Sequence, residues 1–236
     1  RRFGGGGGPQ WRRNNGLNAS KELGLNYAME REKVEFGVSA RYNYRDNDVQ
    51  SLGQIENKFS NSSKISYDNS NNASRSKNQN FNGHLRLEWR PDSLTTFFMR
   101  GNVSSGDSES ASNTLSATYN SDPFAIVENP YQYLDWNSEP NEKLDAVRVN
   151  ELHSGSLSES NSLSANLNMQ LTRKLNDKGR NVTLRAIGSY GDNESERFSH
   201  NLTRYYGDGV ITVQDTIRRY IHTPTNNYNL GAEVSY

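Results

Sequence analysis

Residues 81–103 read FNGHLRLEWRPDSLTTFFMRGNV and carry the clearest signal for the fold of this chain. Within 81–89 the odd positions are apolar or glycine and the even positions are polar or charged. Successive side chains of a β-strand point to opposite faces, so this alternation predicts a strand with one apolar and one polar side. Pro91 and Asp92 supply turn chemistry, and residues 96–103 then resume the pattern. The stretch is therefore predicted to be a β-hairpin with one apolar face.

The same two-residue period recurs along the chain. With the two arms of the hairpin it predicts strands at 17–29, 34–45, 81–89, 96–103, 163–171, 182–190 and 228–236. Short connections between these strands alternate with polar segments of roughly thirty residues or more, which we expect to be loops, at 46–79, 104–160 and 191–226. The prediction is seven strands with short turns at one end and long loops at the other.

Composition excludes several classes of protein. The chain of 236 residues is 32% hydrophobic with a mean hydropathy of −0.96, too little apolar material for an ordinary globular core. Its formal net charge is zero, so the chain lacks the excess of positive charge that would predict a nucleic-acid partner. The absence of cysteine excludes disulfides and thiolate chemistry. No apolar run is long enough for a transmembrane helix.

Strands of alternating polarity, short turns and long polar loops are typical of bacterial outer-membrane barrels. We therefore expect an all-β fold, a transmembrane antiparallel β-barrel, of which this chain is a fragment of about seven strands with short periplasmic turns and long extracellular loops. In lipid an open sheet edge would leave backbone groups unpaired. Residues 1–236 are thus expected to be one partial barrel domain, with the remaining strands and any plug elsewhere in a longer chain.

A family resemblance is carried by four segments: RFGGGGGPQ at 2–10, NNGLNASKELGLNYAMEREKVEFGVSARYNYRDNDVQS at 14–51, LEWRPDSLTTFFMRGNVS at 87–104 and NSLSANLNMQLTRKLNDKGRNVTLRAIGSYGDN at 161–193. They resemble Bacteroidetes-type outer-membrane β-barrel proteins related to TonB-dependent receptors. The resemblance implies a barrel of about twenty-two strands around a plug. It also implies energy-coupled import, with the TonB energising complex reached through that plug.

Catalysis and metal binding are not expected. His84, His153, His200 and His222 show no metal-ligand spacing, so no metal site is predicted. No serine lies in a G-x-S-x-G motif, and the carboxylates form no evident catalytic pair. We predict neither an enzyme nor a bound cofactor.

Two sets of residues are functional candidates. The first is predicted to face the lumen, where it either lines a solute path, contacts a plug or is simply hydrated: Arg41, Arg45, Arg86, Glu88, Arg100 and Arg185. The second comprises Tyr131, Tyr133 and Trp136 of an aromatic, proline-containing island. Exposed aromatic side chains concentrate binding energy, so these three either bind a ligand or fold the loop on itself.

Three functions remain open: a gated importer of a bulky nutrient, a passive porin or secretion channel, and a surface adhesin or structural protein anchored by a barrel. The family resemblance favours the importer. The expected location is the outer membrane, and the expected partners are its lipid, an unidentified nutrient and the TonB complex.

Overall fold

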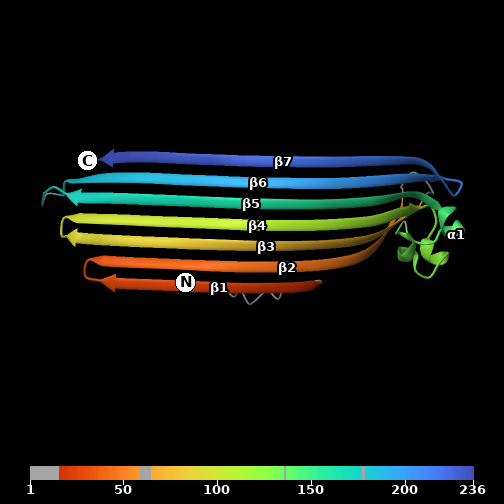
Figure 1. Cartoon of the computed structure of the whole chain (residues 1–236), viewed down its shortest axis with the longest axis horizontal. Coiled ribbons are helices and arrows are strands. Elements are labelled where there is room, and N and C mark those ends of the chain that lie inside the picture. Colours follow the sequence, from red (N-terminus) through yellow and green to blue (C-terminus); the bar gives the residue numbers. More distant parts are fainter. Residues whose placement is uncertain (1–15, 59–64, 136, 177–178) are drawn as a thin grey trace, which may run out of the picture.

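A computed structural model describes residues 16–58, 65–135, 137–176 and 179–236. In this part of the chain seven antiparallel strands form one sheet in sequence order (Figure 1). They are β1 (Leu17–Arg31), β2 (Val34–Lys58), β3 (Ile65–Asp92), β4 (Thr95–Tyr119), β5 (Arg148–Lys174), β6 (Asn181–Gly207) and β7 (Val210–Ser235). The expected all-β class and the seven strands are confirmed. The glycine-rich segment 2–10 lies outside the described residues.

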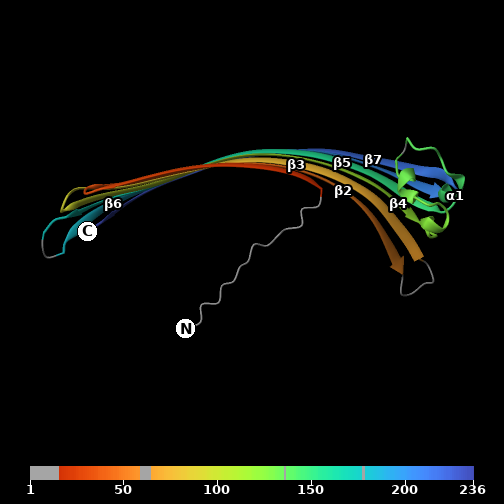
Figure 2. The ribbon, with the colours of Figure 1, turned by 90° about the horizontal axis from the view of Figure 1, so that it is seen from below.

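All helical elements of the described residues lie between β4 and β5. They are η1 (Pro123–Ala125), η2 (Pro130–Tyr133) and α1 (Glu142–Asp145). None of the helices in the described ranges is long and apolar enough to span a membrane. Figure 2 shows the strands as long curved ribbons, with these helices gathered at one end of the sheet.

The strand register joins the apolar residues into one surface. Directly paired residues of antiparallel strands project from the same face. One row of such pairs crosses all seven strands through Met29, Phe36, Leu87, Met99, Met169, Ala186 and Ala232. The next row on that face contains Tyr27, Val38, Leu85, Gly101, Leu167, Gly188 and Leu230. We call this surface the apolar band.

The apolar band is limited in height. On β2 it runs from Val34 through Ala40 and ends at Tyr42, a distance of about 26 Å at ~3.3 Å per residue. Beyond it the same face is polar, because the row through Asp46 contains Lys77, Glu109, Glu159, Glu196 and His222. The strands continue far past this level, since β3 alone has 28 residues.

The polar segments that were expected to be loops mostly continue the strands. β2 extends to Lys58 and β3 begins at Ile65, so much of 46–79 is strand. β6 and β7 are joined only by Asp208 and Gly209, whose φ angles of 52° and 78° suit a tight hairpin turn. Only the connection between β4 and β5, residues 120–147, is long.

The expected loop lengths were wrong because a polar composition does not by itself end a β-strand. Asn and Ser are poor strand formers by themselves, but a ladder is held by backbone hydrogen bonds that any residue except proline can make. Cross-strand pairs of polar side chains add to it. Ser104 and Ser164 hydroxyls lie 2.7 Å apart, and the Gln50 amide donates to Asn71 at 3.2 Å. Each hairpin thus propagates beyond its apolar portion.

Candidate functional site

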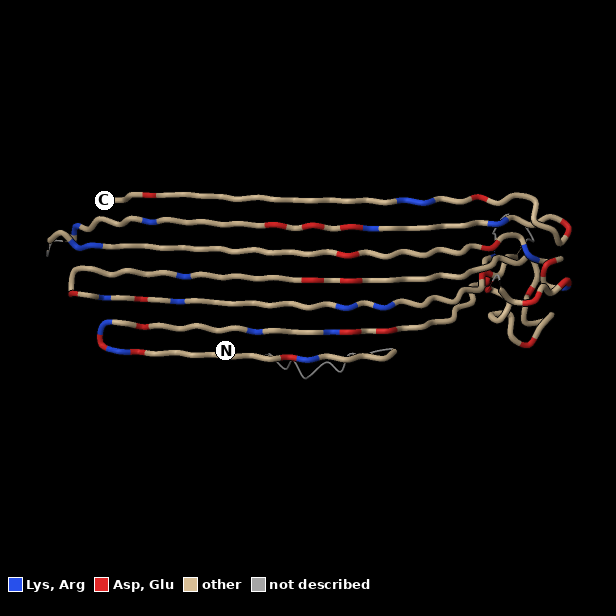
Figure 3. The backbone as a smooth tube through the Cα atoms, in the orientation of Figure 1, with Lys and Arg blue, Asp and Glu red and all other residues tan. Residues whose placement is uncertain are grey.

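The polar face behind the apolar band carries the six charged residues that were predicted to face a lumen. Each is adjacent in sequence to a residue of the apolar face, so it projects from the opposite side of its strand. These residues are Arg41, Arg45, Arg86, Glu88, Arg100 and Arg185. In Figure 3 charged residues lie along the strands as well as at the turns. The register places these six on one face of the sheet, and a lumen-facing role for them stays a prediction.

Four of the charges near the β3–β4 turn form a network. The Arg86 guanidinium lies 3.9 Å from the Glu35 carboxylate and 3.7 Å from that of Glu88. Arg90 also pairs with Glu88 and lies 3.9 Å from Glu35. The arginine side chains are about half exposed, at 55%, so the pairs contribute little to stability. These four residues form a hydrated, charged surface that suits contact with water, a polar solute or a protein partner.

Residues 120–147, which we call the insert, form a small packed unit. Leu134 and Leu144 are buried against Ala117 and Tyr119 at the end of β4. The insert helices begin at capping residues, for example Asn141, whose side-chain oxygen accepts a hydrogen bond from the Leu144 amide at 3.2 Å. Apolar burial and helix caps together stabilise the described part of the insert against the end of the sheet.

The predicted aromatic ligand residues belong to this unit. Tyr131 and Tyr133 pack against the buried cluster, and Tyr131 meets Phe124 edge to face at a centroid distance of 5.7 Å. Trp136 lies outside the described residues. Tyr131 and Tyr133 therefore help to fold the insert, which was one of the two open alternatives. Tyr133 also borders a cavity, so a binding role for it stays a prediction.

That cavity, of about 300 Å³, lies between the insert and the far ends of β5, β6 and β7. Its wall contains a buried ion-pair group, centred on Glu151. Arg148 Nη1 donates to Glu151 at 2.8 Å and Arg204 Nη1 donates to the other carboxylate oxygen at 3.2 Å. Arg148 also donates to the Tyr133 carbonyl at 3.2 Å. The group connects the insert to β5 and β6.

Burial shifts two titratable groups at this junction. It raises the pKa of Asp145, an effect that the nearby Arg148 opposes. It lowers the pKa of His153, against the hydrogen bond that the His153 ring donates to the Leu134 carbonyl at 2.9 Å. Both groups lie at the contact between the insert and the strands, so we expect docking of the insert to depend on pH.

The sequence did not reveal this junction. Arg148 and Glu151 belong to the segment 104–160, which was expected to be a loop. Arg204 is 53 residues from Glu151 in the chain. Pairing between β5 and β6 brings these residues together, and no local sequence motif indicates such a pairing. The register also places Ala117 and Glu151 on the same side of the sheet as the apolar band. The insert therefore packs on that side and not on the polar face.

Comparison with models of known protein families finds none that matches this chain. Comparison with curated proteins finds no significant match. The structure by itself defines the class: a single antiparallel sheet of long strands, apolar on one face over a limited height and polar on the other.

Proposed function

We propose that this chain is part of the wall of an outer-membrane β-barrel, in a transporter related to TonB-dependent receptors that imports a bulky nutrient. The observation that carries the proposal is the apolar band, which crosses all seven strands at one level. Behind it lies a charged face that includes Arg86 and Arg100. A wall between lipid and water needs this division.

The exposure of the band supports lipid as its partner. Leu25 and Leu230 are 66% and 80% exposed. In the described part of the chain no helix or second sheet packs on the band, since the insert docks at the far end of the strands. Contiguous apolar surface of this extent marks an interaction site. Hydrocarbon covers such a surface without any further protein layer.

The transport step rests on the family resemblance and on the charged face. A hydrated, arginine-rich lumen suits passage of a polar solute and contact with a plug outside this chain. Coupling to the TonB energising complex would run through that plug. The proposed location is the outer membrane.

Energy coupling tests the importer against a passive channel. Cells that express the full-length protein are supplied with glycans, peptides and metal chelates, and uptake is compared with that of a deletion strain. For an importer, uptake stops when a protonophore collapses the proton gradient, while ligand binding at the surface persists. Uptake that continues, together with free ion conductance of the purified barrel in a planar bilayer, would replace this proposal with a porin.

One observation favours a second candidate, a surface adhesin or structural protein anchored by its barrel. The strands extend well beyond the apolar band, and the insert packs onto their ends through the buried Leu134 and Leu144. Such a raised, ordered edge could bind another surface. Deletion of residues 120–147 distinguishes the two: loss of cell attachment with uptake intact supports the adhesin, and loss of uptake supports the importer.

A further inference from the structure

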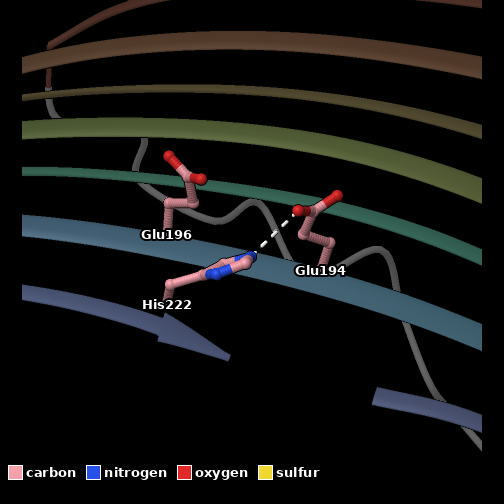
Figure 4. Close-up of side chains that lie close together, drawn as sticks. All are labelled: Glu194, Glu196 and His222. Atoms are coloured by element: carbon pink, nitrogen blue, oxygen red, sulfur yellow. Dashed lines mark hydrogen bonds and ion pairs between the residues drawn. The ribbon is translucent and has the colours of Figure 1, made fainter. Parts of the chain in front are cut away.

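Three metal-ligating side chains meet on β6 and β7, beyond the apolar band. Glu194 and Glu196 are two residues apart on β6, so they share a face. His222 of β7 is the direct cross-strand partner of Glu196. Its Nε2 atom lies 2.9 Å from Glu194 Oε1, as Figure 4 shows. One donor atom from each of the three residues lies within 4.8 Å of the others.

Neighbouring aromatic side chains orient two of these ligands. The Tyr220 hydroxyl donates a hydrogen bond to Glu196 Oε1 at 3.1 Å. The Tyr220 ring stacks on the His222 imidazole with an interplanar angle of 19°, and Phe198 packs against Tyr220 at a centroid distance of 4.6 Å. Outer partners of this kind fix the direction of metal ligands and raise affinity.

The local charge also favours a cation. Glu159 of β5 is directly paired with Glu196, which adds a third carboxylate to the same face. Within the described ranges no lysine or arginine forms an ion pair with Glu159, Glu194 or Glu196. Carboxylates brought together across strands repel one another. A bound divalent cation would remove that repulsion and join β6 to β7.

We propose that Glu194, Glu196 and His222 form a binding site for a divalent transition metal of the Zn²⁺ type. One imidazole nitrogen and two carboxylate oxygens are ligands that Zn²⁺ accepts at about 2.0–2.2 Å. Calcium and magnesium prefer oxygen ligands alone, so the histidine argues against them. The donor atoms converge after small rotations of the flexible glutamate side chains. Glu194 and His222 are exposed, so a further coordination position is open to water or a ligand.

This site does not depend on the proposed transport function. From the sequence no metal site was expected, because no two histidines have the spacing of metal ligands. The structure supplies the missing ligands from a neighbouring strand, 26 and 28 residues before His222. The proposal therefore replaces that expectation.

The test uses tag-free, full-length protein purified in detergent and stripped of metal with a chelator. Zn²⁺ binding is measured by calorimetry for the wild type and for His222→Ala, Glu194→Gln, Tyr220→Phe and His200→Ala. His222→Ala and Glu194→Gln should each weaken one Zn²⁺ site by tenfold or more, and Tyr220→Phe should weaken it less. His200→Ala is the matched control, an exposed histidine on the same face of β6. It should bind Zn²⁺ as the wild type does.

A second measurement needs no variant. Diethyl pyrocarbonate modifies accessible histidines, and the extent of modification at each is read by mass spectrometry. Zn²⁺ should slow modification of His222 and leave that of His200 unchanged. Wild-type Zn²⁺ binding by His222→Ala and Glu194→Gln, or equal modification of His222 with and without Zn²⁺, would overturn the site.

Discussion

Arg86 on β3 and Arg100 on β4 are direct cross-strand partners on the polar face. Like charges at paired positions destabilise a sheet. Here Glu35 and Glu88 lie beside Arg86, and Arg100 stacks 5.7 Å from the centroid of the Phe98 ring. The neighbouring cross-strand pair, Leu87 and Met99, is apolar and lies on the opposite face. A shift of the register by one residue would exchange the two faces, so the pairing is strongly specified.

The first prediction contrasts adjacent residues of β3. Leu87→Arg places a charge in the apolar band and should cost ~2–4 kcal/mol of stability in a membrane. It should therefore reduce the amount of folded, heat-modifiable protein in outer-membrane fractions. Arg86→Leu, on the polar face, is the matched control and should insert normally. Equal tolerance of the two changes would show that the apolar band does not face lipid.

The second prediction concerns sidedness. Outer-membrane barrels carry their longer connections on the extracellular side. The insert is the long connection between β4 and β5, so we expect its end of the sheet, which includes the β6–β7 turn, to lie outside the cell. An epitope tag at Ser138 in the insert, or at Asp208 in the β6–β7 turn, should bind antibody on intact cells. A tag at Glu32 or Ser93 should bind only after permeabilisation. The reverse labelling pattern would invert the topology.

The third prediction is that Glu151 secures the insert. Glu151→Ala leaves Arg148 and Arg204 without their shared carboxylate, and removal of one partner from a buried ion pair costs about 3–5 kcal/mol. Amides of the insert should exchange hydrogen much faster in this variant. The exposed Glu128→Ala in the same insert should change exchange little. A loss below about 1 kcal/mol would mean that apolar packing alone holds the insert.

The fourth prediction concerns pH. The pKa of His153 is lowered from 6.5 by burial, so the docked insert binds fewer protons than the undocked one. The contribution of His153 to docking of the insert is therefore complete above pH 6.5 and is lost as the pH falls through the lowered pKa. Limited proteolysis of the insert should accelerate over that range. His153→Gln should flatten the profile.

The Asp145 carboxyl is expected to change the stability of docking with pH in the opposite direction to His153. Its pKa is raised by burial, so its contribution improves as the pH falls and is lost as the pH rises through that raised value. Asp145→Asn should therefore leave the response around pH 6 in place. A wild-type pH profile in His153→Gln would assign the response to another group.

Much of the fold follows from the sequence alone. The alternation in 81–89 and in the other apolar segments fixes which residues share a face, because side-chain direction in a strand depends only on position parity. Turn residues such as Pro91 and Asp92 determine where β3 ends and β4 begins. These signals are local, so the seven strands and the placement of Arg86 and Leu87 on opposite faces could be predicted from the sequence.

The lengths of the strands and the sites on them were decided by tertiary structure. Segments rich in Asn and Ser form strands because neighbouring strands supply partners for their backbone hydrogen bonds. The sequence of the segment itself does not show whether such a neighbour is present. The buried Arg148–Glu151–Arg204 group and the meeting of His222 with Glu194 arise in the same way. Each depends on the register between strands, a long-range property that sets which distant side chains become neighbours.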